Sequence, residues 1–141
     1  MWPLDYQTRL DRWVDLRCDS TDLDLETCLL QVNDWWQQTP WRPYYLHWDD
    51  YPTWPGPWDL LADNVYCGLA RALGIVYTLL LIDHKNVDEI VLIETDDGNL
   101  VQINGGKYIL NWAPGEMLNI HSTNLVIKKT IDSSKIRHLL G

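Results

Sequence analysis

The sequence predicts an α+β fold in which helices come first and an antiparallel β-meander follows. Two observations predict this order. Apolar residues in the first half recur at helical spacing, whereas from Glu89 onward short apolar runs alternate with turns rich in glycine and asparagine. The length of 141 residues fits a single domain, 1–141. We divide this domain into a helical and Trp/Pro-rich segment (1–62), a helix with an antiparallel sheet (63–131) and a basic tail (132–141).

Two helices are predicted at the start of the chain. The first covers Asp5–Arg17, where leucine, valine and tryptophan lie close to helical spacing. Thr21 and Asp24 have the spacing of a capping box, in which side chains satisfy the exposed amides of a helix start. A single apolar stripe then runs along Leu25–Trp36, and Pro40 ends this second helix.

Residues 35–58 read WWQQTPWRPYYLHWDDYPTWPGPW. The prolines prevent regular structure, yet the segment is far more aromatic than an ordinary loop. Its rings must therefore lie against the domain itself, a partner protein or a sugar, and the sequence leaves these three alternatives open.

A third helix is predicted to begin at Pro57 and to end at Gly74, because one apolar face runs between them. Ile75–Ile82 is a run of strand length rich in β-branched residues, which indicates a buried central strand. Val65–Ile82 is apolar enough to suggest a membrane span, but Arg71 near its centre favours a buried core segment instead.

The remainder is predicted to form strands. A hairpin turn at Asp96–Asn99 contains Gly98, and glycine and asparagine tolerate the positive φ that such turns need. Further turns are expected at Gly105-Gly106 and at Pro114-Gly115. The predicted strands are Glu89–Thr95, Leu100–Asn104, Lys107–Trp112, Met117–His121 and Asn124–Ile131.

The charge balance restricts the partners. Eleven basic and twenty acidic residues give a net charge of -9, which argues against nucleic-acid binding because a phosphate backbone needs a basic face. Acidic residues are concentrated in the first half of the chain, and the net charge of the segment after His121 is positive. An acidic first half and a basic tail suit head-to-tail contacts between subunits of an assembly. Solubility alone also explains the net charge.

Cysteine usage and short motifs restrict the chemistry. Cys18, Cys28 and Cys67 are an odd number without a CxxC spacing, which indicates a reducing compartment, and the first residues do not form a secretion signal. We expect no cofactor, because no glycine-rich phosphate motif is present. We also expect no metal, because the potential ligands of His47–Asp50 are adjacent in a loop.

Cys67 is the candidate nucleophile. Asp63 and Arg71 lie one helical turn on either side of it, and the arginine favours a thiolate while the aspartate opposes one. If the helix begins at Asp63 or just after it, Cys67 lies in the first turn, where the helix dipole also favours a thiolate. A base is required as well, and the spacing does not decide between His84 and His121. The alternative is a buried, packed cysteine.

The stretch DNVYCGLARALGI at 63–75 resembles the cysteine helix of papain-like folds, particularly transglutaminase-like and NlpC-type domains. The resemblance implies that a helix led by Cys67 runs into an antiparallel sheet. It also implies a catalytic histidine at the opening of the next strand, near Asp88 and Glu89, where this sequence has none. The resemblance therefore implies a fold retained without its catalysis.

Four other segments, NDWW, LHWDD, WPGPWDLL and KYILNW, resemble small virion-associated proteins of contractile-tailed bacteriophages, including those of cyanobacteria. This resemblance implies a tail or baseplate protein located in the virion and assembled in the host cytoplasm, with other tail proteins as partners. We therefore expect a non-enzymatic structural subunit that contacts no nucleic acid and no membrane. The expected contact residues are Trp41, Trp48, Tyr51, Trp54, Lys128 and Lys129.

Two alternatives from other functional classes remain open. One is a papain-like cysteine hydrolase or acyltransferase that uses Cys67 with His84 or His121. The other is a carbohydrate-binding module that uses the rings of residues 35–58.

Overall fold

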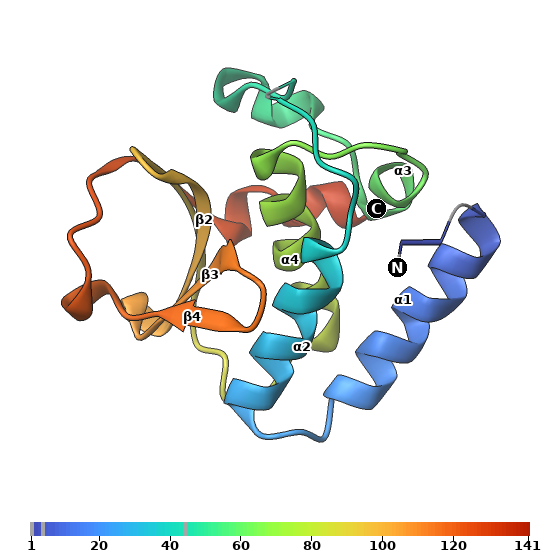
Figure 1. The fold of residues 1–141 in the computed structure, drawn as a ribbon, viewed down its shortest axis with the longest axis horizontal. Helices are drawn as coiled ribbons and strands as arrows, with labels where there is room; N and C mark the ends of the chain where they lie inside the picture. The colour runs from blue at the N-terminus through green and yellow to red at the C-terminus, as the bar shows by residue number, and fades with distance from the viewer. Residues whose placement is uncertain (1, 4, 44) are drawn as a thin grey trace.

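A computed structural model of the chain describes residues 2–3, 5–43 and 45–141. Helices α2 and α4 lie between a β-sheet on one side and helix α1 on the other (Figure 1). The short helix α3 lies beside α1 and α4. The α-helices of the described residues are α1 (Tyr6–Ser20), α2 (Leu25–Gln37), α3 (Pro57–Leu61) and α4 (Gly68–Ile82).

The sheet has five antiparallel strands in the order β4-β3-β2-β1-β5. Its first four strands form a meander, and the fifth crosses back to pair with β1. This arrangement confirms the predicted α+β fold with helices before an antiparallel meander. The strands are β1 (Ile90–Thr95), β2 (Gly98–Ile103), β3 (Tyr108–Ala113), β4 (Glu116–Leu118) and β5 (Ile127–Asp132).

The starts of α1 and α2 are capped by aspartates. Asp5 accepts a hydrogen bond from the amide of Thr8 at 3.0 Å, and Asp24 accepts one from the amide of Thr27 at 3.2 Å. The predicted pairing of Thr21 with Asp24 in one capping box is wrong. The Thr21 hydroxyl instead donates back to the carbonyl of Arg17, because Thr21 lies at the end of α1.

The largest correction concerns residues 57–82. The predicted helix from Pro57 to Gly74 is interrupted after Leu61, and the predicted strand Ile75–Ile82 is the second half of α4. This run is apolar all round because α4 is covered by the sheet on one side and by α1 and α2 on the other. Gly74 does not end the helix: a Cβ there would lie 2.4 Å from the ring of Trp36, so glycine allows the close approach of α2.

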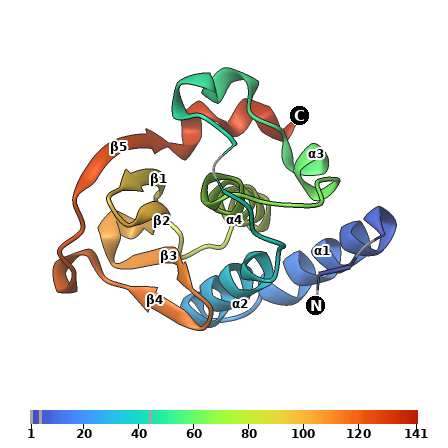
Figure 2. The ribbon, with the colours of Figure 1, turned by 45° about the horizontal axis from the view of Figure 1, so that its top comes forward.

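Most of the aromatic segment packs on its own domain. Trp36, Trp48 and Trp54 are buried, and the Trp36 ring lies edge-on to Trp35 at 5.1 Å. A Cβ on Gly56 would lie 2.6 Å from the carbonyl oxygen of Leu139, so this segment lies beside the end of the chain (Figure 2). The tail forms two 3-10 helices, Ser133–Lys135 and Arg137–Leu140, which are anchored by the fully buried Ile136.

Among the described residues, no helix combines the length and the apolar character needed to cross a membrane.

Candidate functional site

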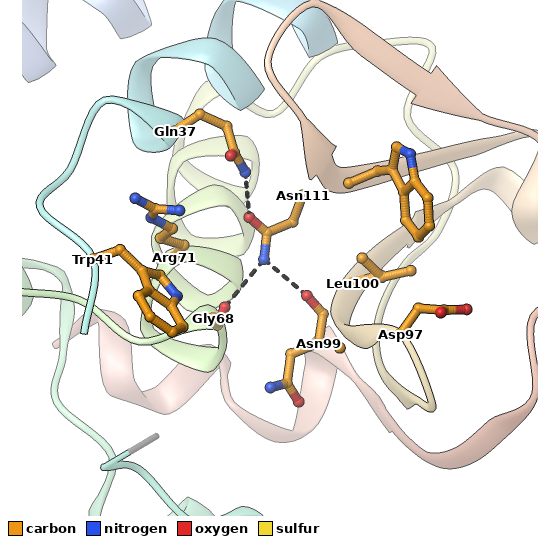
Figure 3. Close-up of a pocket in the computed structure, with 10 residues that line it drawn as sticks. Gln37, Trp41, Gly68, Arg71, Asp97, Asn99, Leu100 and Asn111 are labelled. Carbon is orange, nitrogen blue, oxygen red and sulfur yellow. Dashed lines mark hydrogen bonds between the residues drawn. The ribbon is translucent and has the colours of Figure 1, made fainter. Parts of the chain in front are cut away.

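A cleft of about 330 Å³ opens where the start of α4 meets the end of α2 and strands β2 and β3 (Figure 3). It combines side-chain amides, one guanidinium, one carboxylate and two indoles. The lining residues are Gln37, Trp41, Gly68, Arg71, Asp97, Gly98, Asn99, Leu100, Asn111 and Trp112.

Asn111, on β3, ties the floor of the cleft together. Its Oδ1 accepts a hydrogen bond from Gln37 Nε2 at 2.6 Å, and its Nδ2 donates to the carbonyls of Gly68 at 3.1 Å and Asn99 at 2.8 Å (Figure 3). Its φ of 72° lies in the left-handed region, which asparagine adopts more readily than most residues. One amide therefore joins α2, α4 and β2.

Asn99, at the start of β2, lies between the aromatic segment and α4. Its Oδ1 accepts a hydrogen bond from Trp48 Nε1 at 2.6 Å. Its Nδ2 faces α4, since a Cβ built on Gly68 would lie 3.8 Å from that nitrogen. The start of α4 is thus faced by two carboxamides, those of Asn99 and Asn111.

Two exposed indoles and one cation form the rim. Trp41 is 60% exposed and Trp112 is 41% exposed. Arg71 Nε donates to Thr39 Oγ1 at 2.8 Å, and burial lowers the pKa of the guanidinium. Arg71 remains a cation because the ordinary pKa of arginine is so high. The mouth of the cleft therefore presents flat apolar surface beside one positive charge, with Asp97 opposite.

Cys67 lies immediately before α4, as its N-cap residue, rather than within a longer helix. It is 1% exposed and is not among the residues that line the cleft. Tyr45 lies near Cys67, and the Tyr45 hydroxyl donates a hydrogen bond of 3.3 Å to the carboxylate of Asp63. Burial raises the pKa of the Tyr45 phenol, and the Asp63 carboxylate and the Cys67 thiol raise it further. The thiol is therefore buried and does not line the cleft.

The structure does not bring either predicted base to Cys67. His84 follows the other end of α4, separated from Cys67 by a helix about 22 Å long. Its Nε2 lies 2.7 Å from the carbonyl of Leu23, and its Nδ1 accepts from the amide of Asn86. His84 is therefore a buried histidine with both nitrogens paired, which holds the turn between α1 and α2.

His121 is exposed in the 3-10 helix Ile120–Ser122. Its neighbour Ile120 packs against Gly106, beyond the far end of β2 from Asn99. The position near Asp88 and Glu89, where the papain-like resemblance implied a histidine, also lies at that far end, since both amides bond to Asn104. No histidine of the described chain lines the cleft.

The predicted contact residues separate into three groups. Trp48 and Trp54 are 5% and 3% exposed and donate to Asn99 and to the carbonyl of His47, so they are not available as surface anchors. Trp41 and Tyr51 are exposed. The two lysines lie on β5 in exposed ion pairs, Lys128 with Asp96 at 3.0 Å and Lys129 with Asp49 at 3.6 Å.

Sequence reasoning missed the amides of the cleft. Asn99 was assigned only to the hairpin turn, and Asn111 and Gln37 lay inside predicted regular elements. A polar asparagine within a strand-like run was the available signal at Asn111.

No three His, Cys, Asp or Glu side chains within the described ranges are grouped so that they could hold a metal ion.

No family model matches the sequence, and no curated protein matches it. Among solved structures, the chain is similar to LapG of Legionella pneumophila, with a TM-score of 0.74 and 15% identity over 92% of this chain and 77% of that chain. Calcium-bound LapG gives a TM-score of 0.75 at 15% identity with the same coverage. EGTA-treated LapG gives 0.74 at 15% identity over 99% of this chain and 90% of that chain. The chain therefore has a LapG-like, papain-like fold.

Proposed function

We propose that this chain is a papain-like domain that binds a partner protein through the cleft at the start of α4 and does not use Cys67 as a nucleophile. One observation carries the proposal: the start of α4 is faced by the carboxamides of Asn99 and Asn111, while the Cys67 thiol is buried and does not line the cleft.

The chemistry of a thiol nucleophile explains the importance of this observation. Such a thiol must reach its substrate and needs a base within hydrogen-bond distance of sulfur. A carboxamide cannot take up a proton near neutral pH, so neither asparagine can replace an imidazole. Both N–H groups of the Asn111 amide are also in use, and its oxygen accepts one hydrogen bond, so no donor of this amide is left for a substrate. This arrangement suits a rigid binding surface.

The rim of the cleft supports binding to protein. Tryptophan and arginine are the side chains that most often dominate the free energy of protein–protein contacts, and the mouth of the cleft carries Trp41, Trp112 and Arg71. The hydrogen-bonded floor is organised before any partner arrives, which lowers the entropic cost of binding. The calcium of calcium-bound LapG belongs to that protein, and no metal enters this proposal.

Peptide selection tests this function. Peptides from a random library would be selected on the wild-type chain, and their affinities measured for Trp41→Ala and for Trp58→Ala, an exposed tryptophan outside the cleft. We expect Trp41→Ala to weaken binding at least about tenfold and Trp58→Ala to have little effect. Failure to select any peptide, or equal losses in both variants, would contradict the proposal. Binding of a glycan panel at the same rim would favour the carbohydrate alternative.

A cysteine hydrolase or acyltransferase is the second candidate. The likeness to LapG supports this alternative better than a phage tail subunit, because it concerns a papain-like fold. Iodoacetamide labelling between pH 6 and pH 9 separates the two. We expect only the exposed Cys18 to react, and Cys67→Ser to label like the wild type. Labelling of Cys67 faster than Cys18 below pH 8 would establish a reactive thiolate.

The nature of the partner is a separate part of the proposal. A phage tail protein as partner, and a location in the virion, rest on the four sequence segments given above. The fold likeness does not add to them.

A further inference from the structure

Strand β5 is an edge of the sheet. It pairs with β1, and within the described residues no other strand pairs with it. Residues 127–130 are exposed, in contrast to the buried strands β1 and β2. An exposed edge strand presents unpaired backbone groups to which another chain can add.

A groove of about 380 Å³ follows this edge, between β5 and the 3-10 helix η1 (Trp48–Thr53). Lys129, Thr130 and Ile131 all line it, although successive side chains of a strand point to opposite faces. The groove therefore reaches the free edge of β5 and is not confined to one face of the sheet. Tyr51, which is 37% exposed, forms part of the opposite wall.

We propose that a second copy of this chain adds its own β5 to this edge, antiparallel and related by a two-fold axis at Thr130. In this register Lys128 lies opposite Asp132 of the partner subunit, and Asp132 lies opposite Lys128 of the partner subunit. Thr130 lies opposite Thr130 of the partner subunit. Cross-strand pairs of opposite charge and Thr–Thr pairs both stabilise a sheet.

Charge complementarity selects a second copy and this register. Lysines on an edge oppose pairing with most strands. Lys128 already forms an exposed ion pair with Asp96 at 3.0 Å, and a strand that places a carboxylate opposite Lys128 adds a second favourable charge contact. A two-fold axis one residue earlier would place two Lys129 side chains opposite each other, which like charges disfavour. An axis one residue later would pair Thr130 with Asp132 of the partner subunit and leave Lys128 without a carboxylate opposite.

The groove gives this arrangement room on the helix side of the sheet. Ile131 of the partner subunit lies opposite Lys129 and enters the groove beside Tyr51. Lys129 itself is held by Asp49 in an exposed ion pair of 3.6 Å. Because β5 is only six residues long, the contact is smaller than a standard stable interface. We therefore expect a reversible dimer with a dissociation constant of about micromolar or weaker.

Sedimentation velocity of the whole chain at increasing concentration tests the proposal. We expect a monomer–dimer equilibrium in the wild type, and at least about tenfold weaker association in Lys128→Asp and in Asp132→Lys. The double variant Lys128→Asp with Asp132→Lys should restore association, because the pairs re-form with reversed signs. Lys85→Asp, an exposed lysine in the turn after α4, is the matched control and should dimerise like the wild type.

The double variant also separates pairing from folding. Asp132 accepts a hydrogen bond from the amide of Ser134 at 2.9 Å, so Asp132→Lys alone could disturb the tail. Circular dichroism of each variant checks the fold. A wild type that is monomeric at every concentration overturns the proposal, as do single variants that dimerise normally or a double variant that does not recover. Dimerisation lost in Trp41→Ala but retained in Lys128→Asp would place the contact at the cleft and also overturn it.

Discussion

Thr78 joins three helices through a single hydroxyl group. It lies in α4 and is fully buried, and its Oγ1 accepts hydrogen bonds from the indole nitrogens of Trp13 and Trp36, each at 2.9 Å. The same hydroxyl donates to the carbonyl of Gly74 at 2.7 Å. A hydroxyl can donate once and accept twice, so the capacity of Thr78 is fully used.

We predict that Thr78→Val destabilises the fold strongly. Valine preserves the shape of threonine but removes the acceptor, which leaves two buried indole N–H groups without a partner. Each unsatisfied buried group costs about 1–3 kcal/mol, so the free energy of unfolding should fall by about 2–6 kcal/mol. This is a large fraction of the roughly 5–15 kcal/mol by which domains are stable. Thr78→Ser keeps the hydroxyl and loses one methyl group, at a cost of about 1 kcal/mol.

Urea unfolding at 25 °C, followed by both tryptophan fluorescence and circular dichroism, measures these free energies. Coincident transitions from the two probes would justify a two-state treatment. Two results would refute this reasoning. The free energy of unfolding of Thr78→Val could lie within about 0.5 kcal/mol of the wild-type value, or Thr78→Ser could lose as much as Thr78→Val. Either result would show that the hydroxyl does not connect the three helices.

Three further outcomes are expected. Gly74→Ala should lower the free energy of unfolding by about 1–3 kcal/mol, and with it the urea midpoint, because the added Cβ would lie 2.4 Å from the Trp36 ring. Gly68→Ala, where the nearest atom would lie 3.8 Å away, should leave the midpoint nearly unchanged. The buried Arg9 donates from Nη1 to two backbone carbonyls at and beyond the end of α3, at 3.1 and 2.8 Å. Arg9→Lys keeps the charge but cannot reproduce these paired hydrogen bonds, so we expect a lower melting temperature. A melting temperature equal to that of the wild type would show that Arg9 does not hold the end of α3 in place. Burial raises the pKa of the Cys28 thiol from 9.0 to about 11. The folded state therefore holds the thiol proton more tightly than the unfolded state does. The stability that depends on this protonated thiol is complete below pH 9 and is lost as the pH rises from 9 to 11. Cys28→Ala should show a flatter pH dependence in that range.

Local patterns were sufficient for much of the fold. Helices α1 and α2 and the hairpin of β1 and β2 were predicted, because one face of each is covered and the apolar residues repeat at the period of the element. The prediction failed at α4, which is buried on almost every side. A helix covered all round has no polar face, so its second half has the composition of a buried strand.

The candidate site was only partly visible in the sequence. Cys67 is predicted as a candidate from the charged residues around it, but the apolar face places the start of its helix at Pro57. Only the resemblance to papain-like folds implies a helix led by Cys67, which is where α4 begins. The cleft is not predicted, because Gln37, Gly68, Asn99 and Asn111 meet only after α2, α4 and the sheet have packed together. Strand register decides which polar side chains face α4, and that register is a property of the whole sheet.

The sequence by itself determined that helices precede an antiparallel meander, that acidic residues are concentrated in the first half, and that tryptophan is abundant. Only the tertiary structure decided that Trp48 and Trp54 are covered by their own chain while Trp41 remains exposed. The physical reason is that hydrophobic burial is non-directional and depends on the apolar area removed from water. An indole gains as much from its own domain as from a partner, so composition alone cannot distinguish the two.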